Sequence, residues 1–162
     1  MASSQSREHR GFTLIEMVVV VMIVGILASA AMPLAALHKR RTQEAELRQA
    51  LRTVRTAIDD YKRAWDQGRI EKKADETGYP PTLDALVKGV PDITSPQGAR
   101  IYLLRRLPRD PMASDPSVSA AATWGLRSYA SPPDAPAPGK DVFDVYSRED
   151  KLAMDGTAYQ DW

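Results

Sequence analysis

The hydrophobic pattern changes character within the first 66 residues. Residues 17–37 form 21 consecutive positions without a formal charge, and a helix of that length rises about 31 Å, enough to cross the hydrocarbon core of a bilayer. From Leu47 onward the apolar residues recur at steps of three and four, which predicts an amphipathic helix with one apolar stripe. The stripe consists of Leu47, Ala50, Leu51, Val54, Ala57, Ile58, Tyr61 and Trp65.

Both patterns belong to one predicted helix of more than 50 residues, from Phe12 to Asp66. Gln67 and Gly68 supply its predicted end, because glycine readily adopts the left-handed conformation that closes helices. The charged residues between the apolar positions predict a solvated face, formed by Arg48, Arg52, Arg55, Asp59, Asp60, Lys62 and Arg63. The combination is typical of a membrane stem whose extension packs against a globular head.

Two residues weaken the apolar half of this helix. Pro33 removes a backbone donor and crowds the preceding turn, and Gly25 lowers the helix propensity. We expect a kink or local melting at Pro33 in the isolated chain. Among packed stems, residues 25–33 could unwind, because neighbouring helices would shield the freed backbone groups.

After Gly68 the pattern predicts short elements joined by loops. Gly78-Tyr79-Pro80-Pro81 predicts a turn, and Thr82 is the predicted N-cap of a helix from Leu83 to Lys88 that Gly89 ends. Extended segments or strands are predicted over residues 100–107, 124–130 and 141–147, with a proline-rich loop over residues 131–139.

Composition argues against several kinds of chemistry. The chain has no cysteine, so no disulfide can stabilise the head. The formal charge is +1, which leaves no electrostatic basis for a nucleic-acid partner. His9 and His38 lack the neighbours of a catalytic triad or a zinc site, and no glycine-rich phosphate loop is present. We therefore expect no enzymatic activity and no organic cofactor.

The residues before the apolar stretch form a specific signal. Arg10-Gly11-Phe12-Thr13-Leu14-Ile15-Glu16 resembles the class III signal of type IV pilins and of the pseudopilins of type II secretion. The resemblance implies that a prepilin peptidase cuts between Gly11 and Phe12, N-methylates Phe12 and releases a cytoplasmic leader. Two alternatives stay open: a secretory signal cut near Ala28-Ser29-Ala30, and an unprocessed signal anchor.

Glu16 needs a specific reason, because a carboxylate at the mouth of an apolar helix is costly in lipid. If the leader is removed, the new amine of Phe12 is the natural partner for this carboxylate. In a bundle, Glu16 of one subunit would neutralise the Phe12 amine of a neighbour and set the register between subunits. The alternative is a solvated glutamate at the headgroup interface. Phe12, Glu16 and Pro33 are the predicted assembly residues.

The head resembles the major, G-type pseudopilins. The resemblance rests on Gly78-Tyr79-Pro80, Leu107-Pro108-Arg109-Asp110-Pro111, Asp144-Val145-Tyr146-Ser147 and the final Trp162. It implies an α+β, pilin-like fold, in which the long N-terminal helix packs on a small antiparallel sheet with a loop-rich C-terminal region. The implied function is a structural subunit of the type II secretion pseudopilus, assembled from the inner membrane and driving or gating protein export across the outer membrane.

The same resemblance implies three segments: a leader over residues 1–11, a transmembrane and assembly helix over residues 12–37, and a periplasmic head over residues 38–162. The implied location is a single pass through the bacterial inner membrane. Expected partners are further copies of the chain, minor pseudopilins, the prepilin peptidase, the inner-membrane secretion platform and, before assembly, the lipid bilayer. A type IV pilin for adhesion, twitching or DNA uptake is the alternative. Many such pilins close a C-terminal loop with a disulfide, so the missing cysteines favour a pseudopilin.

In G-type pseudopilins the loop after the last strand binds Ca²⁺, which takes six to eight oxygen ligands. The resemblance suggests a calcium site here, with candidate ligands Asp150, Asp155, Asp161, Ser147 and the main-chain carbonyl of Arg148. The tail departs from the family pattern, because consecutive aspartates are absent and residues 151–154 place an ammonium and three apolar groups in the loop. The alternative is an Asp155-Gly156 turn and a tail held without metal.

Overall fold

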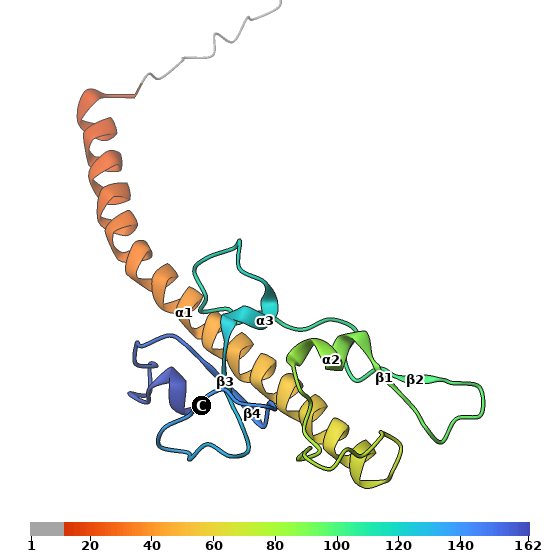
Figure 1. The fold of residues 1–162 in the computed structure, drawn as a ribbon. Coiled ribbons are helices and arrows are strands. Elements are labelled where there is room, and N and C mark those ends of the chain that lie inside the picture. The colour runs from red at the N-terminus through yellow and green to blue at the C-terminus, as the bar shows by residue number, and fades with distance from the viewer. Residues whose placement is uncertain (1–11) are drawn as a thin grey trace, which may run out of the picture. The chain divides into compact units, whose positions relative to one another are not determined.

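The computed structural model describes residues 12–162. Its largest element is helix α1, which runs from Leu14 to Asp66 (Figure 1). The chain divides into two compact units, one ending at Arg40 and the other spanning residues 41–162. The boundary falls within α1, so the helix gives its apolar half to the first unit and its amphipathic half to the second.

In the first unit, α1 is an apolar helix. Every side chain at residues 12–29 is exposed, and the large ones include Leu14, Ile15, Val18 and Ile23. A contiguous apolar surface of this kind marks a membrane or protein interaction site.

The helix begins two residues later than predicted. The Thr13 hydroxyl accepts a hydrogen bond of 3.3 Å from the Glu16 amide, which makes Thr13 the N-cap and leaves Phe12 before the helix. Of the two outcomes predicted at Pro33 in the isolated chain, local melting is not observed, since α1 is helical through residues 25–33; a kink there stays a prediction. Alanine, leucine and methionine surround Pro33 and favour helix strongly. Unwinding inside an assembly stays a prediction.

The end of α1 is confirmed at Asp66 and has a defined geometry. Gly68 adopts a φ of 73°, its amide donates to the Trp65 carbonyl at 3.0 Å, and the Arg69 amide donates to the Ala64 carbonyl at 2.9 Å. This pair of bonds is a Schellman closure, which satisfies the last carbonyls of the helix.

The second unit has one core, and the predicted stripe of α1 forms its centre. Every stripe residue from Leu47 to Tyr61 is buried, and Trp65 is half-buried against the same core. The head contributes the opposing side chains, among them Leu83, Leu86, Trp124, Val142, Val145 and Tyr159. Gly78 has a φ of 86°, and a Cβ atom there would lie 2.7 Å from the Trp65 ring, so the turn at 78–81 closes against the helix only with glycine.

The remaining elements are short. Helix α2 spans Leu83–Lys88, as predicted, with Thr82 as N-cap and Gly89 as C-cap. Strand β1 (Val90–Pro91) pairs antiparallel with β2 (Arg100–Ile101), and β3 (Trp124–Arg127) pairs antiparallel with β4 (Asp144–Ser147). Helix α3 covers Ala120–Thr123, and a 3-10 turn, η1, covers Tyr159–Asp161. The fold is α+β and pilin-like, with two separate two-stranded sheets.

All three predicted strands are longer than the observed ones, because hydrogen bonds outside the sheet draw the chain away from it. After Ile101, the amides of Leu103 and Leu104 donate to the Leu86 carbonyl at the end of α2, at 3.1 and 2.9 Å. After Arg127, the Ser128 amide donates to the Ala137 carbonyl at 2.9 Å. Before β4, the Val142 amide donates to the Pro80 carbonyl at 2.8 Å. The prolines of residues 131–139 lie in a loop, as predicted.

Candidate functional site

The first candidate site is the start of α1. Glu16 lies in the first turn, where the partial positive charge of the helix end stabilises a carboxylate. Thr13 and Glu16 have the threonine-x-x-glutamate spacing of a capping box. The Glu16 side chain is exposed, and no ion pair described for residues 12–162 involves it. Phe12 is 76% exposed; Gly11 and the predicted cleavage site lie outside the described residues.

The apolar half of α1 completes this site. An 18-residue window in α1 has a mean hydropathy of 2.6 and no buried residue. By length and composition α1 can therefore cross a membrane, although a signal sequence near an N-terminus meets the same criteria. Pro33, the third predicted assembly residue, lies within this helix.

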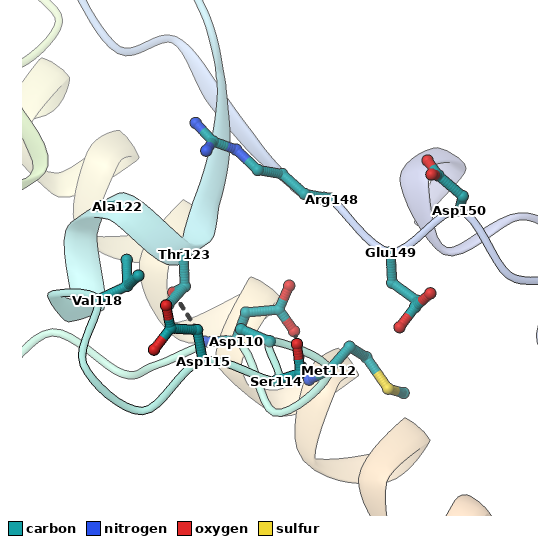
Figure 2. A pocket seen from close by; sticks show the side chains of 11 residues that line it. Asp110, Met112, Ser114, Asp115, Val118, Ala122, Thr123, Arg148, Glu149 and Asp150 are labelled. Atoms are coloured by element: carbon teal, nitrogen blue, oxygen red, sulfur yellow. Dashed lines mark hydrogen bonds between the residues drawn. The ribbon is translucent and has the colours of Figure 1, made fainter.

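The second candidate site is the C-terminal tail with the predicted calcium ligands. Ser147 is fully buried on β4, and its hydroxyl donates to the Asp110 carboxylate at 2.7 Å. Arg148 and Asp150 follow it and line a cavity of about 340 Å³ beside Asp110 and Asp115. In Figure 2 the side chains of Arg148 and Asp150 extend away from Asp110. The Asp150 carboxylate instead accepts a hydrogen bond of 2.7 Å from the side-chain amide of Gln160.

The other two predicted ligands lie further along the tail. Asp155 accepts hydrogen bonds from the Thr157 hydroxyl at 2.6 Å and from the Thr157 amide at 3.0 Å. Those two bonds, together with the Arg48 guanidinium, hold the pKa of the Asp155 carboxyl below its usual value. Asp161 lies exposed in η1.

The three predicted aspartate ligands, Asp150, Asp155 and Asp161, therefore do not form a group that could hold a metal ion. The Asp150 and Asp155 carboxylates accept hydrogen bonds from different protein donors, and the Ser147 hydroxyl donates its hydrogen bond to Asp110. Across residues 12–162 there is no group of three or more acidic, histidine or cysteine side chains that could hold a metal. As arranged here, this donor set does not fit a calcium ion, and the calcium site stays a prediction.

The Leu-Pro turn of residues 107–111 proves to be a packing element. The Trp124 indole donates to the Pro108 carbonyl at 2.9 Å, and the Asp110 amide donates to the Thr123 hydroxyl at 3.2 Å (Figure 2). Asp110 itself is buried. The turn thus connects α3, β3 and β4.

Sequence reasoning missed the side chains of α1 that hold the tail. Arg48 and Arg55 were predicted on a solvated face, yet both contact tail residues, as does Glu44. A signal for this role exists in the sequence. Positions 44, 48 and 55 fall within about 40° of one another on a helix of 3.6 residues per turn, at the border of the apolar stripe.

Comparison with known proteins finds a family motif over the start of α1 and relatives over most of the chain. Residues 6–32 match the prokaryotic N-terminal methylation motif. Type II secretion system core protein G of Klebsiella michiganensis is 30% identical over 139 residues, covering 83% of this chain and 90% of that protein. The protein of the same name from Pseudomonas aeruginosa is 32% identical over 157 residues, covering 94% of this chain and 88% of that protein. No solved structure matches. The chain belongs to the family of type II secretion system core protein G.

Proposed function

We propose that this chain is a structural subunit of a type II secretion pseudopilus. The observation that carries the proposal is the apolar half of α1, exposed at every position of residues 12–29, with Glu16 in its first turn and a folded head on the same chain. A helix of this kind needs lipid or neighbouring helices around it. The relatives named core protein G are similar over both the stem and the head, which favours the pseudopilus over a type IV pilus. The role is structural and not enzymatic.

In this proposal a prepilin peptidase cuts between Gly11 and Phe12 and methylates the new amine. The N-terminal methylation motif over residues 6–32 supports this step. Thr13 stays in the mature chain, so the N-cap of α1 is retained after cleavage. Residues 12–37 then anchor the subunit in the bacterial inner membrane, and residues 38–162 form a head in the periplasm.

Assembly moves the stem from lipid into a bundle with other copies and minor pseudopilins at the secretion platform. Lipid tails and neighbouring stems are equally apolar, so the hydrophobic effect gives little preference for the bundle. A Glu16 carboxylate paired with the Phe12 amine of a neighbour supplies both attraction and a fixed register. The pair is formed only between processed subunits, because the amine is created by cleavage.

Two substitutions of Glu16 test this pairing. Glutamine can take the third helical position of a capping box, whereas alanine cannot, and neither carries charge. We expect Glu16→Gln and Glu16→Ala both to reduce the amount of pseudopilus at least about tenfold, the factor that corresponds to about 1.4 kcal/mol of lost pairing. The measurement is cross-linking of neighbouring subunits in the native membrane, together with export of a secreted protein.

Thr13→Ala is the matched control, because it removes the cap at a cost of about 1 kcal/mol and leaves the charge in place. It should assemble in the wild-type register. If Glu16→Gln assembles normally while Glu16→Ala and Thr13→Ala both fail, Glu16 acts by capping its own helix and the pairing is refuted.

A further inference from the structure

The C-terminal tail is fastened to α1 by three charged side chains on one face of the helix. Glu44, Arg48 and Arg55 each contact residues more than 80 positions later in the sequence. All three belong to the second unit. Figure 1 shows the tail lying beside this part of α1.

Glu44 holds the middle of the tail. It is 7% exposed, and its carboxylate accepts hydrogen bonds from the Met154 amide at 2.9 Å and from the Tyr159 hydroxyl at 2.8 Å. A carboxylate this far from water is stabilised by such donors. It therefore fixes both sides of the 154–159 turn against the helix.

Arg48 holds the tip of the tail one helical turn later. Its guanidinium lies 3.0 Å from the Asp155 carboxylate and 4.0 Å from the centre of the Trp162 ring. The Trp162 indole donates to the Thr157 hydroxyl at 2.6 Å. The positive group at this part of the tail is therefore the Arg48 guanidinium. It contacts Asp155 and Trp162 directly, and Trp162 in turn contacts Thr157.

Arg55 holds the two ends of the same segment. Its guanidinium donates to the Asp144 carboxylate at 2.7 Å, to the Val145 carbonyl at 3.0 Å and to the Trp162 carbonyl at 2.6 Å. One side chain therefore joins strand β4 to the last residue of the chain.

We propose that α1 itself supplies the charges that close the tail, with the Arg48 guanidinium facing Asp155, and that this closure requires no Ca²⁺. Asp155 already receives two donors from Thr157 in addition to Arg48. A divalent cation at Asp155 would meet a positive guanidinium at ion-pair distance and would need to displace it. Among the apolar residues of the tail, Ala153 is buried and adds to the closure by packing in the core.

The test uses the full chain in detergent micelles, with trypsin cleavage after Arg148 and Lys151 followed by intact mass. Both residues are exposed in the tail, so the cleavage rate reports tail opening. For the wild type we expect the same rate and the same melting temperature in EGTA and in about 1 mM CaCl₂. Arg48→Gln should speed tail cleavage severalfold, on the order of fivefold, in either condition.

Arg52→Gln is the matched control, because Arg52 is exposed on the same helix and makes no hydrogen bond or ion pair with the described tail. The Arg52→Gln substitution also removes one trypsin site, as Arg48→Gln does. It should leave the tail rate unchanged. If the Arg48→Gln protein does not accumulate in cells, Asp155→Asn tests the same ion pair by removing the charge of the carboxylate. The proposal is overturned if Ca²⁺ slows tail cleavage or raises the melting temperature of the wild type, or if Arg48→Gln and Asp155→Asn behave like Arg52→Gln.

Discussion

Asp92 illustrates how the head keeps a carboxylate ionised away from water. It is 8% exposed and accepts hydrogen bonds from the Thr94 hydroxyl at 2.6 Å and from the Arg69 guanidinium at 2.6 Å. The Thr94 hydroxyl first, and Arg69 next, lower the pKa of Asp92 below its usual value. These bonds tie the loop after α1 to the loop after β1.

The lowered pKa makes Asp92 a source of acid sensitivity. A carboxyl with a depressed folded-state pKa stabilises the fold above its unfolded pKa of about 4, and this stabilisation is lost as the pH falls through the folded value. We expect Asp92→Asn to unfold at lower urea than the wild type at neutral pH, and to lose less stability than the wild type on acidification below about pH 4. Urea midpoints across that range measure this. Parallel pH profiles for the two proteins would contradict it.

Residue identity alone could not distinguish solvated charges from structural ones. Arg48, Arg52 and Arg55 follow the same spacing rule on α1, but only Arg48 and Arg55 meet tail residues. The difference depends on where a segment about 100 positions later folds back. A helical pattern carries no information about that return.

Among the elements, strand β4 depends on the Leu-Pro turn through one buried carboxylate. Asp110 accepts from the Ser147 hydroxyl at 2.7 Å and from the Met112 amide at 2.8 Å. Asp110→Ala leaves both donors without their acceptor, and we expect it to lower the free energy of unfolding by about 2–3 kcal/mol. Chemical denaturation of the full chain in micelles measures this loss.

Asp115→Ala is the control for that element, because Asp115 lines the same cavity but is exposed. Its loss of stability should be clearly smaller than that of Asp110→Ala. Equal losses for the two variants would show that the Asp110 contacts do not support β4.

The predictability of each element follows from how local its determinants are. The apolar stripe of α1, its end at Gly68 and helix α2 depend on spacing and on glycine, and all three were predicted correctly. The strands were predicted too long, because their ends are set by distant partners such as the Leu86 carbonyl. Thr13 as N-cap was missed, although its spacing to Glu16 is a capping signal.

On the scale of the whole molecule, one continuous helix joins two different surroundings. Its first half is apolar and is exposed over residues 12–29, and its second half is the centre of the head core. The sequence predicts both halves, since each has its own periodicity. It does not predict the contacts of the tail, which arise only when α1 and residues 144–162 fold together.

The most direct test of the account is the intact mass of the protein purified from its native membrane. We predict a chain that begins at Phe12 and is about 14 Da heavier than the bare sequence, the mass of one added methyl group. That result requires processing by a prepilin peptidase and creates the amine with which Glu16 is proposed to pair. A chain that begins at Met1, or one that begins near Ala31, would contradict the pseudopilin assignment and the assembly role of Glu16.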